Sequence, residues 1–346
     1  MLFLLPLVVA SQNCKPTSCQ DILGLSCISL ISSVNSTTMN LAECPNEFPY
    51  CPFTDLTFDS TCITMGKTTQ STSYPGDPCD TNRTCVYSDC IDHVCQGIPS
   101  SVACNDTGQC TPGYRCDQNY CKSLLFIGYN NGNRNMNCTT DYECVNNGVC
   151  DNGNCYKYYS KGEGLTVGNC VNGVSLICES GLCYNGICLS KNVISKSSTP
   201  IPCQSNLDCI SDYYNSPPNE FTVYSECQCG FNKDGLAYCT QFPGDDIQSK
   251  YLKIAKEWTE SNDIFKCHSY SRFKLDCIKK YWSDSKYKEY AYYSMYAANY
   301  PQIQGNQECV KKMLLSEFYD AQEEYQSSRG FDLGVLGSLF YIIYGF

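Results

Sequence analysis

Four groups of four cysteines recur along the chain at nearly the same spacing, and they constrain the fold more than any other feature. In the third group, CTTDYECVNNGVCDNGNC at residues 138–155, the gaps hold five, five and four residues; only the fourth group departs clearly, with seven in its first gap. The Asn-Gly and Gly-Asn pairs favour tight turns with positive φ, so each group predicts a short hairpin with two crosslinks. Such short units cannot bury a core alone, and disulfides replace it. The sixteen cysteines are Cys79, Cys85, Cys90, Cys95, Cys104, Cys110, Cys116, Cys121, Cys138, Cys144, Cys150, Cys155, Cys170, Cys178, Cys183 and Cys188.

The cysteine content also indicates the compartment. Thirty of the 346 residues are cysteine, a density typical of a disulfide scaffold, and disulfides persist in oxidising surroundings. Residues 1–10 (MLFLLPLVVA) are apolar and fit a signal peptide cleaved after Ala10; a buried N-terminal strand is the alternative. An extracellular or cell-surface location follows, and the candidate glycosylation sites are Asn35, Asn82, Asn105 and Asn137.

The net charge of −11 excludes some partners. Residues 11–244 hold 21 acidic and 11 basic side chains, whereas residues 245–329 hold 13 of each. Nucleic acids and anionic lipid surfaces both require a basic surface. We therefore expect no nucleic acid partner.

Two cysteine-rich segments flank the quartets, which span residues 79–190. The first, residues 11–66, has six cysteines that can close among themselves. The second, residues 203–240, ends in CQCGFNKDGLAYC, which resembles the C-terminal half of an EGF-like module. Residues 67–78 and 195–202 are rich in Ser, Thr, Pro and Gly and predict linkers.

Residues 245–326 predict a Tyr-rich helical domain. Ile247, Tyr251, Ile254 and Trp258 share one helix face. Further helices are expected over residues 264–282, 286–299 and 307–325. The eleven tyrosines between positions 251 and 325 fit the core of a small bundle better than a ligand-binding patch.

The number of cysteines in each segment predicts a long-range disulfide. The first segment has six cysteines and the quartets have sixteen, whereas residues 203–239 have five and the helical region has Cys267, Cys277 and Cys309. The two odd numbers predict a bridge between the last two regions. In an unbroken helix Cys267 and Cys277 would lie about 15 Å apart, beyond disulfide reach. Cys309 would then bond one of them, unless the helix breaks near Ser269.

The C-terminal residues 331–346 end in the apolar run VLGSLFYIIYGF, which is too short to span a bilayer as a helix. Small residues precede it, and the pattern resembles a GPI-anchor signal with attachment at Ser327 or Ser328. A final segment packed on the helical domain or lying at an interface is the alternative. A lipid anchor would make the membrane a partner of the chain.

The sequence predicts no catalytic, cofactor or metal site. It has no Cys-x-x-Cys, on which zinc ribbons depend, and no phosphate-loop or nucleophile-elbow motif. Cys267 and His268 are adjacent, but a disulfide and a surface histidine are expected in place of a nucleophile and its base. The chain is therefore expected not to be an enzyme.

The third quartet resembles the N-terminal cysteine-rich region of the Dickkopf family. Cys138-Thr-Thr-Asp-Tyr-Glu-Cys144 is similar to that family's C-x-x-D-x-E-C, and residues 152–155 to its N-G-x-C. The chain lacks the family's Cys-Cys doublet and basic stretch, so antagonism of Wnt co-receptors does not carry over. In plan, the chain is similar to multi-repeat cysteine-rich surface proteins of protists.

The predicted fold is a series of small disulfide-rich repeat modules, built of short β-hairpins, followed by an all-α C-terminal domain. The predicted function is that of a non-enzymatic extracellular or cell-surface structural or binding protein, whose partner is an unknown protein or glycan. A secreted Dickkopf-like signalling antagonist or a protease inhibitor is the alternative.

Overall fold

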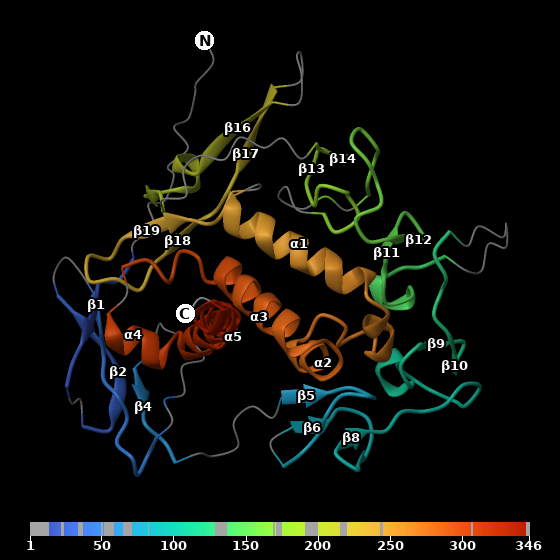
Figure 1. Cartoon of the computed structure of the whole chain (residues 1–346), viewed down its shortest axis with the longest axis horizontal. Helices are drawn as coiled ribbons and strands as arrows, with labels where there is room; N and C mark the ends of the chain where they lie inside the picture. Colours follow the sequence, from blue (N-terminus) through green and yellow to red (C-terminus); the bar gives the residue numbers. More distant parts are fainter. Residues whose placement is uncertain are drawn as a thin grey trace. The chain divides into compact units, whose positions relative to one another are not determined.

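The structure is a computed structural model of the chain. It describes residues 14–21, 24–33, 37–49, 51, 59–64, 71–81, 83–128, 137–168, 170, 175–190, 200–214, 220–242, 245–305 and 307–343; at 71, 211–214, 220–224 and 330–343 only the backbone is described. The predicted signal peptide lies outside these residues. As expected from the sequence, many short hairpins are followed by a region with several helices (Figure 1). Fifteen disulfides stabilise the fold.

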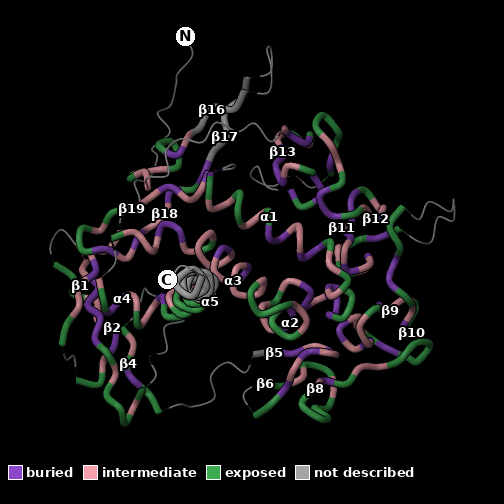
Figure 2. The backbone as a smooth tube through the Cα atoms, in the orientation of Figure 1, coloured by how far each residue is buried: buried purple, intermediate pink, exposed green. Residues whose placement is uncertain are grey.

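The chain forms two compact units, each assembled from distant segments. Unit 1 comprises Met1–Gly66, Val193–Gln248 and Ser294–Glu323, and unit 2 comprises Lys67–Asn192, Ser249–Tyr293 and Glu324–Phe346. The predicted helical domain, residues 245–326, is thus divided between the two units. Buried residues form several small clusters in the part that the structure describes (Figure 2).

Four two-stranded hairpins in unit 2 carry the last two cysteines of each quartet. They are β7 (Cys90–Ile91) with β8 (Val94–Cys95), β9 (Tyr114–Asp117) with β10 (Tyr120–Ser123), β11 (Gly148–Asp151) with β12 (Asn154–Lys157), and β13 (Cys183–Tyr184) with β14 (Ile187–Cys188). Each turn has two consecutive residues with positive φ, as in Asn152-Gly153, and such turns match the twist of the strands. The positive-φ turns expected from the sequence are therefore present.

All four quartets have the same crossed pairing, in which the first cysteine bonds the third and the second bonds the fourth. In the third quartet, Cys138 bonds Cys150 and Cys144 bonds Cys155, although Cys150 and Cys155 are direct cross-strand partners. Because cross-strand partners point to the same face, each hairpin presents two sulfurs on one side. The loop with the first two cysteines is fastened there. The other pairs are Cys79–Cys90, Cys85–Cys95, Cys104–Cys116, Cys110–Cys121, Cys170–Cys183 and Cys178–Cys188.

Short 3-10 helices precede the second cysteine of the second quartet, of the third quartet and of residues 203–239. They are η1 (Thr107–Gln109), η2 (Asp141–Glu143) and η3 (Asn206–Asp208). In η1 the Asp106 carboxylate accepts the backbone N–H of Gly108, so the cap fixes this one-turn helix locally. The first quartet has in this place β6 (Arg83–Cys85), which pairs in parallel with β5 (Ser71–Ser73).

Unit 1 contains a sheet of order β1-β3-β2-β4. Ile28 and Leu41 of this sheet pack with Val310 in a cluster whose side chains are almost wholly buried. The strands are β1 (Thr17–Cys19), β2 (Ser26–Ser32), β3 (Thr37–Leu41), β4 (Ser60–Thr61), β15 (Pro202–Cys203), β16 (Ile210–Tyr214), β17 (Glu220–Tyr224), β18 (Cys227–Cys229) and β19 (Ala237–Cys239), the last five forming sheets β15-β19-β18 and β16-β17.

The disulfides of unit 1 correct two expectations. The six cysteines of residues 11–66 do not close among themselves, since Cys14 bonds Cys229 and Cys19 bonds Cys309. The predicted bridge between the helical region and residues 203–239 is therefore wrong. An even number of cysteines in the first segment is equally compatible with two outgoing bonds. The local pairs are Cys27–Cys51, Cys44–Cys62, Cys203–Cys227 and Cys209–Cys239.

Residues 203–239 therefore have the crossed pairing of the quartets. Cys203 and Cys209 bond Cys227 and Cys239, which are cross-strand partners. In the stretch CQCGFNKDGLAYC, which resembles part of an EGF-like module, Cys229 bonds Cys14. In its disulfides this segment is a fifth module.

The helical region departs from prediction in two places. The helices are α1 (Asp246–Glu260), η4 (Asn262–Lys266), α2 (Leu275–Tyr281), α3 (Asp284–Ala298), α4 (Glu308–Met313) and α5 (Ser316–Ile343). The helices expected over 264–282 and 307–325 are each broken. The first break lets Cys267 bond Cys277 at a Cα–Cα distance of 5.9 Å, so the expectation that Cys309 bonds one of them is wrong. Within the described residues, no helix is both long and apolar enough to cross a membrane.

Candidate functional site

A polar but buried stretch of unit 2 is the candidate site. We call residues 261–282, between α1 and α3, the linking segment. Four of the five side chains from 268 to 272 are almost inaccessible: His268 and Ser271 are 0% exposed, Ser269 1% and Arg272 2%. Buried polar groups must be hydrogen-bonded to be tolerated. The hydrogen-bond partners of His268, Ser271 and Arg272 therefore show which modules the segment contacts.

The turn of the linking segment is fixed by the helical core. Trp258 of α1 is fully buried, and its indole N–H donates to the backbone oxygen of Arg272 at 2.7 Å. The ring of Trp258 lies 5.2 Å from that of Trp282. The Cys267–Cys277 disulfide closes the loop between these points. Both tryptophans of the chain therefore lie next to the site.

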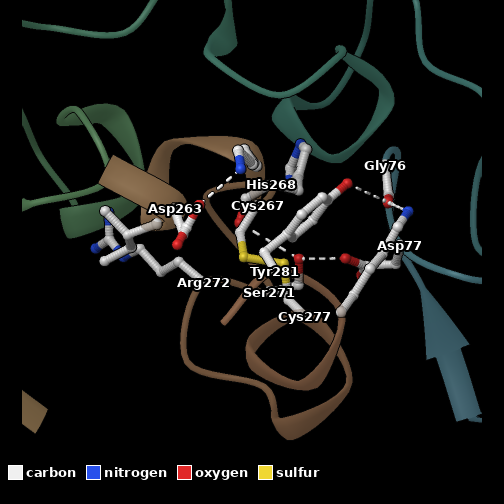
Figure 3. The surroundings of a disulfide bond; sticks show 12 residues. Gly76, Asp77, Asp263, Cys267, His268, Ser271, Arg272, Cys277 and Tyr281 are labelled. Carbon is white, nitrogen blue, oxygen red and sulfur yellow. Dashed lines mark hydrogen bonds and ion pairs between the residues drawn. A yellow bond between two sulfur atoms is a disulfide. The ribbon is translucent and has the colours of Figure 1, made fainter. Parts of the chain in front are cut away.

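The linking segment binds the first quartet through residues just before Cys79. Ser271 donates to the Asp77 carboxylate at 2.8 Å, and Lys280 and Tyr281 both donate to the backbone oxygen of Gly76 (Figure 3). Burial raises the pKa of Asp77, although hydrogen bonds from Tyr74 and Ser271 oppose the shift.

His268 connects the segment to the second quartet. The backbone N–H of Tyr270 donates to Nδ1, so Nε2 carries the hydrogen and donates to the backbone oxygen of Thr107 at 3.1 Å. The imidazole stacks on Tyr74 with ring centroids 5.4 Å apart. Burial lowers the pKa of His268 to about 4. The surface position expected for this histidine is wrong, because the broken helix turns its side chain inward.

The third quartet is held by a buried amide. Asn146, 1% exposed, donates to the backbone oxygens of Ile264 at 2.8 Å and Cys267 at 2.6 Å. The guanidinium of Arg272 donates to the backbone oxygen of Asp141 at 3.0 Å. Three successive modules are thus bonded to one segment, mostly at backbone oxygens. Neither Asn146 nor the serines belonged to a sequence motif, so sequence reasoning could not select them.

Two hollows lie beside the linking segment. The first, the Arg272 hollow, has a volume of about 430 Å³ and is lined by Asp141, Tyr142, Tyr158, Leu176, Ser269, Tyr270, Arg272, Phe273 and Lys274. The second, of about 580 Å³, is more apolar and includes Phe126, Ile127 and Phe265, which are 61%, 38% and 43% exposed. The two offer different chemistry, since only the first contains charged side chains.

The structure places the other predicted site residues as follows. Fifteen disulfides take up all thirty cysteines. Sulfurs of Cys104, Cys110 and Cys121 lie within 4.8 Å of one another, as in four similar described groups, but each belongs to a disulfide and none is a thiolate ligand. Asn105 and Asn137 are exposed, whereas Asn35 and Asn82 lie outside the described residues. Ser327 and Ser328 lie within α5.

Comparisons with known proteins identify no relative: no family model, curated protein or solved structure matches the chain.

Proposed function

We propose that the chain is a non-enzymatic extracellular or cell-surface binding protein, whose cysteine-rich modules present surface to a protein or glycan. The observation that carries this proposal is the complete pairing of the cysteines in fifteen disulfides. Such a fold is stable only outside a reducing compartment. The oxidised state is therefore part of the working protein.

The chemistry of the linking segment supports a structural role for its reactive residue types. Cys267 is in a disulfide, and both ring nitrogens of His268 are already bonded to backbone groups. A nucleophile needs a free thiolate, and a general base needs access to its substrate. The pair that could suggest an enzyme thus serves to hold modules together.

The modules offer their hairpins as contact surface. Ile91, Tyr120 and Ile187 each precede or follow a hairpin turn and are 52%, 51% and 41% exposed. Exposed aromatic and aliphatic side chains on a rigid frame are typical anchors of protein interfaces. The crossed disulfides hold these anchors in place before binding, which lowers the entropy cost of association.

The C-terminal residues decide between two forms of this function. A GPI anchor attached at Ser327 or Ser328 would keep the protein on the cell surface, whereas a packed C-terminal segment would leave a soluble ligand, as expected for a Dickkopf-like antagonist or a protease inhibitor.

The test is surface labelling of cells that express the full chain or a chain lacking residues 331–346. The anchored form predicts surface signal that is released by phosphatidylinositol-specific phospholipase and lost on truncation. Recovery of both chains from the medium, with the C-terminal Phe346 peptide intact in the full chain, rules the anchor out and favours the soluble ligand.

A further inference from the structure

Arg272 brings a positive charge into the interior of unit 2, and no described residue gives it an anionic partner. Its side chain points away from Asp77 and the first quartet (Figure 3). Nη2 donates to the backbone oxygen of Asp141, but Nε and Nη1 are buried and have no hydrogen-bond partner. Among the described carboxylates, none forms an ion pair with this guanidinium. A buried cation with two unfilled donors is costly, so the arrangement points to a missing acceptor.

Aromatic rings compensate the charge only in part. The guanidinium carbon lies 5.8 Å from the ring centroid of Tyr142, 5.5 Å from that of Tyr158 and 5.8 Å from that of Phe273. Cation–π attraction stabilises the charge but fills no N–H donor. The rings also exclude water, which strengthens any hydrogen bond that an anion makes inside. The site is therefore suited to an acceptor that also has an apolar body.

The Arg272 hollow has a further hydrogen-bond donor and is bounded on one side by aromatic rings. The hydroxyl of Ser269 is buried in it without a partner. The Asp141 carboxylate is held by the backbone N–H of Cys150, and the Lys274 ammonium donates to the backbone oxygen of Thr72. On the open side Tyr142 is 45% exposed and meets Tyr270 edge to face at 4.6 Å.

We propose that the Arg272 hollow binds a small organic carboxylate. The two carboxylate oxygens accept from the edge of the Arg272 guanidinium formed by Nη1 and the second N–H of Nη2, one of them also accepts from the Ser269 hydroxyl, and the ligand body lies against Tyr142 and Tyr270. The guanidinium fork matches a planar carboxylate with two parallel hydrogen bonds. A single cation with two open donors balances one negative charge, which favours a carboxylate over a doubly charged phosphate. Because Nε and Nη1 of Arg272 are buried, the ligand enters by displacing the exposed Tyr142 ring. This inference does not depend on the proposed function.

The test uses the full secreted chain with its disulfides intact, and calorimetric titration with benzoate and with benzamide, its uncharged counterpart. Benzoate is expected to bind and to raise the melting temperature, and benzamide to do neither. Arg272→Met is expected to abolish benzoate binding and, because it removes an uncompensated buried charge, to raise the melting temperature of the empty protein. Lys279→Met, which removes one exposed charge of the same segment, is the matched control and should leave binding unchanged.

Two milder variants keep the test decisive if Arg272→Met does not fold. Arg272→Lys keeps the charge but loses the fork and should weaken benzoate binding about tenfold or more. Ser269→Ala should weaken it less. Wild-type protein that binds no benzoate up to about 1 mM, or variants that bind as tightly as wild type, would overturn the proposal and leave water alone as the occupant.

The source of the carboxylate is distinguished by three further probes. Glucuronate represents an acidic sugar, a short peptide with a free C-terminus represents a chain end, and the same peptide amidated is its control. Binding of glucuronate or of the free peptide that depends on Arg272 supports the proposal and names the source. Equal binding of the free and amidated peptides, insensitive to Arg272→Lys, contradicts it.

Discussion

The buried His268 predicts that unit 2 loses stability in mild acid. An unfolded histidine has a pKa near 6.5, whereas burial holds the pKa of His268 at about 4 in the folded chain. A lowered folded pKa means that the stabilisation is complete above pH 6.5 and is lost as the pH falls toward 4. The interval corresponds to a loss of about 3 kcal/mol in the free energy of unfolding between pH 7 and pH 4.

The assay is urea unfolding followed by tryptophan fluorescence, with disulfides intact. Trp258 and Trp282, the only tryptophans of the chain, lie 5.2 Å apart beside the linking segment and report on it directly. His268→Gln keeps one donor and one acceptor but does not titrate, so the wild-type loss minus the variant loss isolates the histidine. The Asp77 carboxyl titrates in the opposite sense, because its raised pKa favours the folded state at low pH, and this contribution cancels in the difference.

The matched control is His93→Asn, which replaces the exposed histidine at a turn position with φ of 62° by a residue that accepts positive φ. This variant should retain the full pH dependence of the wild type. If wild type and His268→Gln lose the same stability between pH 7 and pH 4, the histidine is not buried against the second quartet and the reasoning fails.

Three further tests probe the packing of unit 2, all by the same fluorescence assay. Asn146→Ala leaves the backbone oxygen of Cys267 without its donor and removes one of the two donors to the backbone oxygen of Ile264, which also accepts from the N–H of Cys267. It should lower the free energy of unfolding by about 1–3 kcal/mol; an effect under about 0.5 kcal/mol would show that the amide is dispensable. A Cβ added at Gly97 would lie 2.8 Å from Pro75 Cβ, so Gly97→Ala should cost about 1–3 kcal/mol, whereas Gly162→Ala, with no atom within 4 Å, should be nearly neutral; equal effects would count against the close approach. Joint replacement of Cys267 and Cys277 by alanine opens a short loop and should cost about 3 kcal/mol, and an unchanged urea midpoint would contradict the bond.

The hairpins were predictable because their determinants are local. A pair such as Asn152-Gly153 fixes a two-residue turn, and the turn fixes which residues face each other across the strands. The helix α1 could be predicted equally well, since Ile254 and Trp258 recur on one helix face and both are buried.

The break in the predicted helix over 264–282 was not predictable with the same rules. Helical spacing continues through Ile264 and Ile278, and both are buried as the pattern requires. Between them, Ser269 and Ser271 leave the helix, and Ser271 and the preceding His268 are stabilised by partners far away in the sequence. Helix propensity depends on the local sequence and therefore carries no information about hydrogen-bond partners that are distant in the sequence.

The disulfides that join residues 11–66 to later parts of the chain could not be predicted from the number of cysteines. Six cysteines in residues 11–66 satisfy an even count whether none or two of them bond elsewhere. Counting cysteines can show that at least one disulfide must leave a segment that has an odd number of them. Counting cannot show that two disulfides leave a segment that has an even number of cysteines.

The most direct test of the disulfide framework is a disulfide map of the native protein by mass spectrometry after proteolysis without reduction. A fully oxidised extracellular protein should show fifteen bonds, with Cys19 joined to Cys309 and the crossed pairing in every quartet. Peptides that join Cys309 to Cys267 or Cys277, or several free thiols, would contradict it.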